Sequence, residues 1–291
     1  MNDRTLDQNV AEFKKTVTED WAGDDTAAAW QKHYLAMRDQ MAGVTQVLVE
    51  DAKIEPGMSV LDLASGNGQP SIPIAKAVGA HGKVCATDFN PGMLAALKSN
   101  AADEGVTNIE THVCDAHDLP FADASFDRVT SRFGAMFFCE TAHSLSEVRR
   151  VLKPGGRLTF MVWGAPIPGS YFATAVLPFM KRSGQKPDPD GPGPMRYAEP
   201  NKLAALYRSA GFVDVTESSH VVSSPYKGTP EKMLADMVEI ARPFRSMVES
   251  MPADVRRAAE EEAYAAARSI QSDGAINLTS PVIIVSGNAP A

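Results

Sequence analysis

Three aspartates stand at or near the ends of three successive strand-like runs, and a glycine turn follows the first run. The turn spans residues 64–68, and the acids are Asp62, just before it, Asp88 and Asp115. The carboxyl ends of parallel strands meet at one edge of a sheet, so we expect these carboxylates to line one crevice. Asp62 can face an ammonium group, Asp88 both hydroxyls of a ribose, and Asp115 an exocyclic amine. The set predicts a ligand with an adenosine and a cationic amino-acid tail.

A dinucleotide is the other ligand that uses a glycine turn after a first strand. Its G-x-G-x-x-G pattern needs a third glycine for close packing of helix against strand. Only Gly66 and Gly68 fit here, because Ser71 holds the third position. Asp62 would also place negative charge near an anionic pyrophosphate. The pattern therefore disfavours a nicotinamide-dependent oxidoreductase, which is kept as a lesser alternative.

The elements that must position these residues alternate between strand-like and helix-like segments. Apolar runs predict strands at about 59–63, 83–87, 109–114, 126–131, 157–163, 212–222 and 277–286. Four strands with helical patterns between them imply parallel pairing with right-handed crossovers. We expect an α/β fold: a Rossmann-like, seven-stranded, mostly parallel sheet with helices on both faces, N-terminal helices and a helical cap.

Composition breaks divide the chain into three parts. Residues 1–56 form a helical lead-in with an apolar stripe, which either packs on the sheet or folds over its ligand edge. Residues 57–164 form the cofactor-binding core. Residues 165–291 hold the lid or cap helices and the last two strands of the same sheet. Within that part, residues 184–194 are rich in proline and glycine, which predicts a loop or lid.

Charge and cysteine content exclude several classes of protein. The 291 residues carry 28 basic and 36 acidic side chains, a net charge of −8, and no cluster of lysine and arginine. This disfavours a nucleic-acid or anionic-membrane partner. The charged N-terminus does not resemble a signal peptide, and no apolar run approaches the ~18 residues of a membrane span. The three scattered cysteines have no metal spacing, so we expect a cytoplasmic protein without a metal.

Five segments in the order and spacing of a known family carry a resemblance. They are VLDLASGNG (60–68), ATDFNPGML (86–94), CDAHDLPF (114–121), SFDRVTSRFG (125–134) and EVRRVLKPGGRL (147–158). The sequence resembles the class I S-adenosylmethionine-dependent methyltransferases, and within them the group related to ubiquinone/menaquinone-biosynthesis C-methyltransferases. The resemblance implies an enzyme that uses S-adenosyl-L-methionine and releases S-adenosyl-L-homocysteine. A binding protein for this cofactor without transfer activity is the alternative.

The resemblance also implies which residues bind the cofactor. The glycine turn holds the methionine part, Asp88 the ribose and Asp115 the adenine edge, and Arg132 lines the sulfonium. The full set is Asp62, Ala64, Gly66, Asn67, Gly68, Asp88, Phe89, Asp115, Ala116 and Arg132. Ala64 replaces the family's first glycine, which is tolerable if its φ is negative. Arg132 stands where the quinone enzymes often have serine, so the acceptor is left open.

Apolar and aromatic residues after the fourth and fifth strands predict a pocket for a small, apolar or aromatic methyl acceptor. They are Phe133, Met136, Phe137, Trp163 and Tyr171. Methyl transfer is an in-line attack that mainly needs alignment and exclusion of water, and O-, N- and C-methylation stay open. His143, in the loop after the fourth strand, and Tyr34, in the lead-in, are the catalytic candidates. No Asp-His pairing is visible, so no general base is assigned; the oligomeric state is also open.

Overall fold

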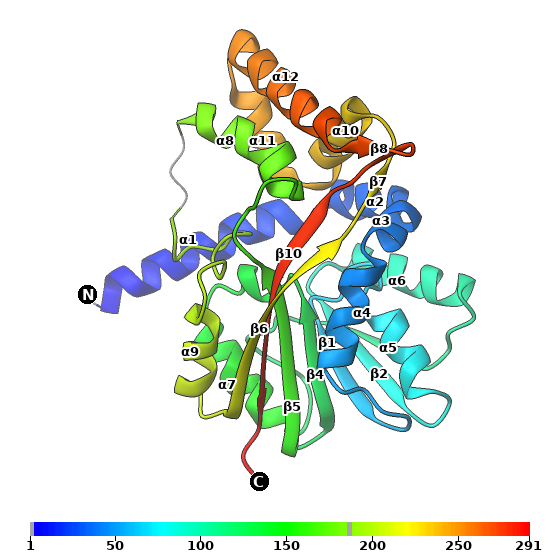
Figure 1. The fold of residues 1–291 in the computed structure, drawn as a ribbon. Coiled ribbons are helices and arrows are strands. Elements are labelled where there is room, and N and C mark those ends of the chain that lie inside the picture. Colours follow the sequence, from blue (N-terminus) through cyan, green and yellow to red (C-terminus); the bar gives the residue numbers. More distant parts are fainter. Residues whose placement is uncertain (1–2, 185–187) are drawn as a thin grey trace.

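The computed structural model describes residues 3–184 and 188–291, which form a central sheet beneath a helical cap (Figure 1). In chain order its strands are β1 (Ser59–Leu63), β2 (Lys83–Asp88), β3 (Ile109–Val113), β4 (Phe126–Arg132), β5 (Leu152–Trp163), β6 (Val213–Ser223) and β10 (Thr279–Asn288). Their spatial order is β3-β2-β1-β4-β5-β10-β6. The first five strands pair in parallel, and β10 is antiparallel to β5 and β6. The prediction of a seven-stranded, mostly parallel sheet is confirmed.

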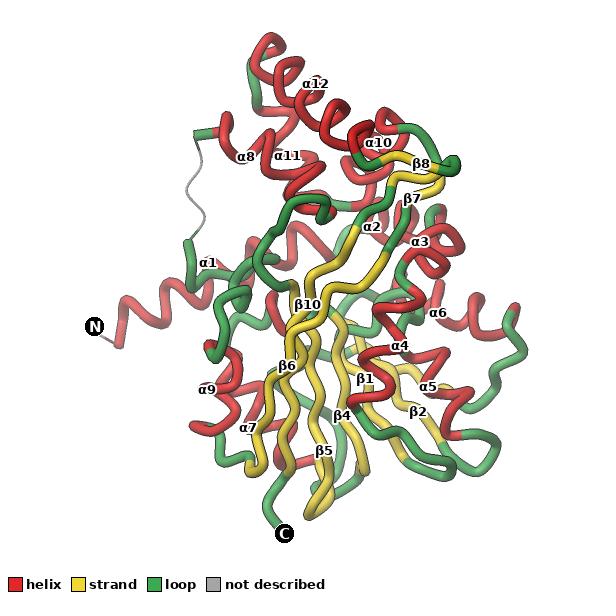
Figure 2. Tube along the Cα trace, viewed as in Figure 1, coloured by secondary structure: helices red, strands yellow, loops and turns green. Residues whose placement is uncertain are grey.

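Strand order reverses between β1 and β4, and this reversal locates the crevice in which such sheets bind ligands. Side chains of β1 alternate between the two faces. Val60 packs under α5 (Ser71–Val78), whereas Leu61 and Leu63 belong to the core on the other face, to which α7 (Thr141–Val151) and α9 (Lys202–Ser209) contribute. Helices therefore cover both faces, as Figure 2 shows.

The helix after β2 begins where the sequence signals it. Asn90 caps α6 (Pro91–Asp103): its side chain accepts hydrogen bonds from the N–H groups of Gly92 (2.8 Å) and Met93 (3.3 Å). Proline fits the first position of a helix because that N–H has no helical partner. This cap fixes the chain at the carboxyl end of β2, directly after Asp88.

The lead-in consists of α1 (Asp3–Trp21), α2 (Asp24–Lys32), α3 (Tyr34–Gln40) and α4 (Ala42–Asp51). The cap consists of α8 (Leu177–Ser183), α10 (Pro230–Ile240), α11 (Arg242–Ser250) and α12 (Ala253–Ser269), with a buried core of its own. In Figure 1, α1 and α2 lie between the cap and the carboxyl ends of the parallel strands. Among residues 3–184 and 188–291, no helix combines the length and hydropathy that a membrane span requires.

Several predicted boundaries were wrong. The helix before β5 begins at Thr141, so His143 lies in α7 and not in a loop. A small second sheet was missed altogether; it joins β7 (Tyr226–Lys227), β9 (Ala275–Ile276) and β8 (Gln271–Ser272). The predicted lid at 184–194 lies partly outside the described residues, at 185–187. Beyond these, the N–H of Gly193 donates to the carbonyl of Met136 (3.1 Å).

Candidate functional site

The glycine turn at the end of β1 has three residues with positive φ. Gly66 has a φ of 54° and Gly68 of 117°, but Ala64 also has a φ of 51°. The condition stated for alanine at this position, a negative φ, is therefore not met. The chain has to reverse direction directly after β1, and alanine adopts the left-handed conformation there at a cost of about 1–2 kcal/mol. A Cβ added at Gly66 would meet no atom within 4 Å, so there is open space beside the turn.

Asp88 connects the end of β2 to this turn. One of its carboxylate oxygens accepts a hydrogen bond from the N–H of Gly66 (3.0 Å), and the other accepts one from the N–H of Asn90 (2.9 Å). Burial raises its pKa above the usual range, although these bonds oppose the shift. Each carboxylate oxygen can accept a second hydrogen bond. The structure thus joins the turn and Asp88, as the sequence predicts, and leaves accepting capacity on the carboxylate.

Asp62 lies beneath the turn, fully buried. Its carboxylate accepts hydrogen bonds from the hydroxyls of Ser71 in α5 (2.5 Å) and Thr130 in β4 (2.8 Å). Burial raises its pKa to about 6, against the opposing effect of these hydroxyls and of Arg132. Because both oxygens are engaged inside the protein, Asp62 supports the turn from below, and the structure does not direct it at a ligand's ammonium group.

Asp115 follows β3 by two residues and pairs with His117. The carboxylate accepts from the backbone N–H of His117 (3.0 Å) and contacts its ring Nδ1, while ring Nε2 accepts from the N–H of Glu140 (3.0 Å). The imidazole therefore carries its proton on Nδ1. The hydrogen bond from His117 holds the pKa of Asp115 below its usual range. The sequence-based statement that no Asp-His pair exists was wrong: the two residues meet because a turn brings them together.

This pair orders the loop that would hold an adenine. His117 is buried with both ring nitrogens engaged, so it positions Asp115 and is not available as a base. The Asp115 side chain is 52% exposed, which leaves one oxygen facing outward. Phe89 and Ala116, the other two residues predicted for the adenine, are partly exposed.

Arg132 and Tyr34 link the lead-in to the core. Arg132 donates to the hydroxyl of Thr45 in α4 (2.6 Å), and its Nε has no hydrogen-bond partner among the described residues. Burial lowers its pKa to about 10, although Asp62 opposes the shift. Tyr34 is buried; its hydroxyl donates to Glu104 (2.8 Å) and accepts from Gln69 (3.2 Å). Both predicted site residues therefore have anchoring contacts.

The lead-in covers the crevice. The side-chain amide of Asn67, in the turn, donates to the carbonyl of Trp30 (3.0 Å), and that of Asn90 donates to the carbonyl of Trp21 (2.7 Å). Asn67 is consequently turned towards α2. Both placements left open for the lead-in occur: α1 and α2 lie over the ligand edge, whereas Val44 and Leu48 of α4 pack on the sheet against β5 and β10.

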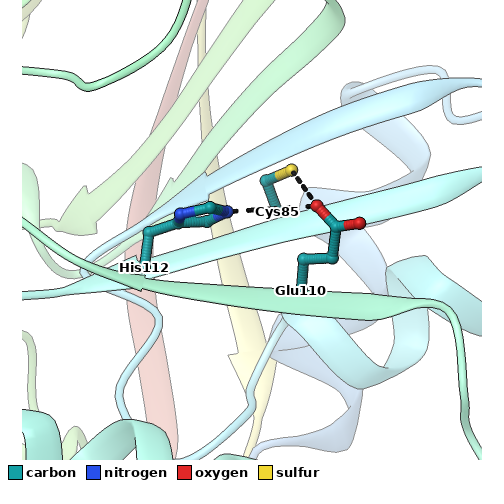
Figure 3. A group of neighbouring side chains, drawn as sticks. All are labelled: Cys85, Glu110 and His112. Atoms are coloured by element: carbon teal, nitrogen blue, oxygen red, sulfur yellow. Dashed lines mark hydrogen bonds and ion pairs between the residues drawn. The ribbon is translucent and has the colours of Figure 1, made fainter.

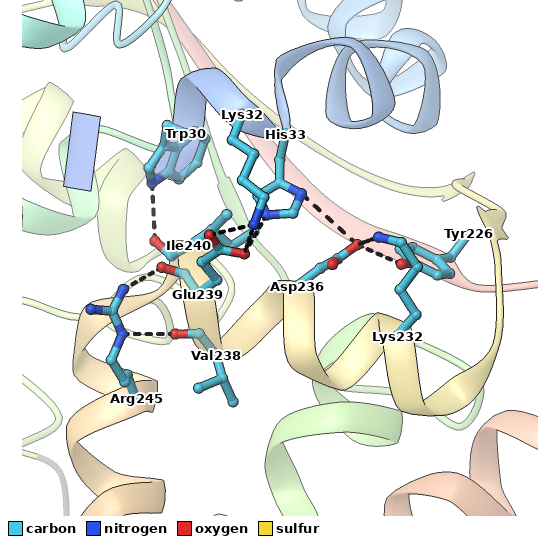
Figure 4. Close-up of polar contacts among 10 residues, drawn as sticks. All are labelled: Trp30, Lys32, His33, Tyr226, Lys232, Asp236, Val238, Glu239, Ile240 and Arg245. Carbon is cyan, nitrogen blue, oxygen red and sulfur yellow. Dashed lines mark hydrogen bonds and ion pairs between the residues drawn. The ribbon is translucent and has the colours of Figure 1, made fainter. Parts of the chain in front are cut away.

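A second set of contacts joins the lead-in to the cap (Figure 4). The indole N–H of Trp30 donates to the carbonyl of Ile240 (3.0 Å). Glu239 pairs with Lys32 (2.8 Å) and with Nε2 of His33 (2.9 Å). His33 is buried, and its Nδ1 lies 3.9 Å from Asp236. Residues 30–33 therefore contact both the turn and α10; periodicity in the sequence could not reveal this.

Aromatic residues lie around the end of β4 and β5. Phe133, with a φ of 64°, stacks on Trp163 at 3.9 Å, and Trp163 contacts Phe172 edge-on at 5.7 Å. Phe137 packs on Trp21 of the lead-in at 5.1 Å. These aromatic rings form two groups, one of Phe133, Trp163 and Phe172 and the other of Phe137 and Trp21.

Met136, Tyr171 and His143 are not part of these two ring groups. Met136 is 1% exposed and belongs to the main core, where its sulfur accepts a hydrogen bond from the backbone N–H of Trp163 (3.5 Å). Tyr171 packs against the cap core. His143 is exposed on α7, with its ring 6.1 Å from that of His117. The structure therefore brings together Phe133 and Trp163, and it gives His143 no place in the aromatic groups.

Comparison with known proteins agrees with this geometry. The model of the ubiE/COQ5 methyltransferase family matches residues 29–182. The chain is 38% identical over 157 residues to the ubiquinone/menaquinone biosynthesis C-methyltransferase UbiE of Bordetella avium, a match that covers 50% of this chain and 61% of that protein. The corresponding protein of Paraburkholderia phymatum is 37% identical over 159 residues, covering 51% and 65%. The matched part thus spans less than two thirds of these relatives.

Solved structures share the fold. Phosphoethanolamine N-methyltransferase 2 of Haemonchus contortus, in complex with S-adenosyl-L-methionine, superposes with a TM-score of 0.57 at 16% identity, covering 96% of this chain and 60% of that chain. The YcgJ protein of Bacillus subtilis gives a TM-score of 0.53 at 18% identity, covering 85% and 98%. The Rossmann-like fold of methyltransferases is therefore confirmed for this chain.

Proposed function

This chain belongs to the ubiE/COQ5 methyltransferase family, and we propose that it transfers a methyl group from S-adenosylmethionine to a small, apolar or aromatic acceptor. The observation that carries the proposal is the junction of the glycine turn with Asp88, at the point where strand order reverses. A carboxylate held there by backbone N–H groups is placed to accept hydrogen bonds from a ribose.

The site residues fit this cofactor. The space beside Gly66 allows a ligand to approach the backbone, and the outward oxygen of Asp115 can accept from an exocyclic amine. We propose that Phe89 packs on the face of the adenine and that Ala116 lies at its edge. Ala64 and Gly68 shape the turn, Asp62 supports it from beneath, and Asn67 joins it to the lead-in. Arg132, which donates to Thr45 of α4, stays the residue that we propose lines the sulfonium.

When bound, S-adenosylmethionine supplies an electrophilic methyl group on a cationic sulfonium. The chain's own task is to orient the acceptor and to exclude water. We propose that the stacked pair Phe133 and Trp163 binds the acceptor, with Phe137 and Tyr171 bordering it. The lead-in, residues 1–56, and the cap, within 165–291, would close over the core, residues 57–164. No general base is proposed, and the atom that is methylated is left open.

Calorimetric titration of the purified chain with S-adenosylhomocysteine tests the cofactor assignment. Asp88→Ala removes the acceptor for the ribose and should weaken binding by about 100-fold, because hydrogen bonds to a charged group contribute about 1.5–3 kcal/mol each. Asp103→Ala, at the exposed end of α6, is the matched control and should bind like the parent. Equal affinity of Asp88→Ala and the parent would overturn the site.

Methyl transfer itself needs a separate measurement. Mass spectrometry of ligands that copurify with the chain, followed by turnover assays with apolar and aromatic acceptors, should yield a methylated product. Tight cofactor binding without turnover across the panel would favour the alternative, a non-catalytic binding protein.

A cytoplasmic location is part of the proposal, because the three cysteines are all free, as expected in a reducing compartment.

A further inference from the structure

Three potential metal ligands meet at the outer edge of the sheet, away from the glycine turn. Cys85 on β2 and Glu110 and His112 on β3 point towards one another (Figure 3). In the parallel register, Cys85 lies opposite Glu110 and Thr87 lies opposite His112. Alternate residues of a strand share one face, so the thiol, the carboxylate and the imidazole all project from the same side.

The distances between the ligand atoms suit a single ion. The Cys85 Sγ lies 3.9 Å from the Glu110 Oε2, which is 4.0 Å from the His112 Nε2, and all three atoms lie within 4.8 Å of one another. A tetrahedral zinc ion, with bonds of about 2.0–2.3 Å, needs ligand separations of roughly 3.5 Å. The three atoms would therefore have to move closer together when the ion binds.

His112 supplies an independent indication of a ligand. Its Nε2 is buried and has no hydrogen-bond partner among the residues that the structure describes. The ring packs edge-on against Phe121 at 5.0 Å, which limits its rotation and keeps Nε2 directed at the cluster. A buried nitrogen without a partner is uncommon in folded proteins, and a bound ion would satisfy it.

We propose that Cys85, Glu110 and His112 form a zinc(II) site that fastens the edge strand β3 to β2. Thiolate, imidazole and carboxylate together are a donor set that zinc favours. The Glu110 side chain is 64% exposed, so solvent can supply a fourth ligand. This site could not be predicted from the sequence, because Cys85 and Glu110 are 25 positions apart and only the pairing of β2 with β3 brings them together.

Zinc binds cysteine as the thiolate, so the thiol proton of Cys85 passes to solvent when the ion binds. Lys83, an exposed residue at the start of β2, can turn its ammonium group into solvent when a cation binds.

Titration of the full chain, first stripped with a chelator and kept in a phosphine reductant, tests the proposal. Zinc chloride should bind with one equivalent per chain in calorimetry. Glu110→Gln and His112→Gln should each weaken binding by more than about 100-fold, because even residues that only support a ligand contribute about 10- to 100-fold. His81→Gln, an exposed histidine before β2, is the control and should leave affinity unchanged.

Cobalt(II) as a probe tests the sulfur ligand. The parent and Cys139→Ser should show a thiolate-to-cobalt charge-transfer band in the near ultraviolet, and Cys85→Ser should lack it. Circular dichroism checks the fold of each variant; Glu110 is exposed, so Glu110→Gln gives a test even if Cys85→Ser unfolds. Absence of stoichiometric binding to the parent, or a band that survives in folded Cys85→Ser, would overturn the site.

Discussion

At the scale of single residues, the turn after β1 contains a strained backbone conformation at Ala64. Ala64 has a left-handed backbone, and its Cβ lies so close to Gly134 that a Cβ added there would be 2.6 Å away. The sequence shows that Ala64 replaces the family's first glycine, but it does not show the sign of its φ. That sign depends on the paths of the chain after β1 and after β4.

Replacement of Ala64 by glycine should relieve this strain. We expect Ala64→Gly to raise the free energy of unfolding by up to about 1 kcal/mol, since the left-handed penalty of about 1–2 kcal/mol exceeds the entropy cost of glycine. Urea denaturation measures the change. Ala77→Gly, inside α5, is the matched control and should lower stability by about 0.5–1 kcal/mol. A loss of stability in both Ala64→Gly and Ala77→Gly would contradict the presence of strain at Ala64.

Asp62 predicts a pH dependence of stability. Its pKa in the folded chain is about 6, above the usual value of 3.8, so the folded state holds the proton more tightly than the unfolded state does. Its contribution is therefore greatest below pH ~4 and is lost as pH rises to ~6. As pH rises across this window, the free energy of unfolding of the parent should fall by up to about 3 kcal/mol relative to that of Asp62→Asn.

Denaturation curves of both proteins at several pH values measure that difference. Asp103→Asn is an exposed control and should follow the parent at every pH. If the difference between the parent and Asp62→Asn stayed constant from pH 4 to pH 6, the buried carboxylate would have to be ionised throughout.

At the scale of elements, long strands with strong periodicity could be predicted from the sequence, whereas very short strands could not. Six strands of the main sheet begin and end within two residues of their predicted ranges, because long apolar runs between glycine and proline turns carry a clear signal. The start of β5 was wrong: the strand begins at Leu152, so residues 153–156, predicted as a turn, belong to it. Strands β7, β8 and β9 have two residues each, too short to show any alternation. The Asp115–His117 pair and the contacts of residues 30–33 depend on tertiary placement, which no local pattern encodes.

The junction between α2 and α10 should control the mobility of the lead-in. Glu239 binds both Lys32 and His33, so we expect Glu239→Gln to speed hydrogen exchange in α2 and α3. Global stability should change by less than about 1 kcal/mol, since the Lys32 ion pair is exposed to solvent. Glu231→Gln removes another exposed ion pair of α10, with Arg268, and should leave exchange in α2 unchanged. Unaltered exchange in Glu239→Gln would show that other contacts hold the lead-in.

At the scale of the whole molecule, one short segment connects the proposed cofactor site to the cap. Trp30 accepts a hydrogen bond from Asn67 in the glycine turn through its carbonyl and donates one to Ile240 in α10 through its indole. A ligand at the turn that orders α2 should therefore also order α10, although α10 belongs to the cap. The division into lead-in, core and cap stays a prediction. The hydrogen bonds of Trp30 allow the coupling between these parts to be measured.

Hydrogen exchange with and without S-adenosylhomocysteine measures that connection. In the parent, we expect added ligand to slow exchange in α2 and in α10. Trp30→Phe keeps an aromatic ring and the backbone carbonyl but loses the indole donor, so protection should persist in α2 and decline in α10. Trp163→Phe, whose ring stacks on Phe133 away from this junction, is the control and should retain protection in both helices. Equal protection of α10 in the parent and Trp30→Phe would mean that the coupling runs through other contacts, because the indole hydrogen bond would then contribute nothing to it.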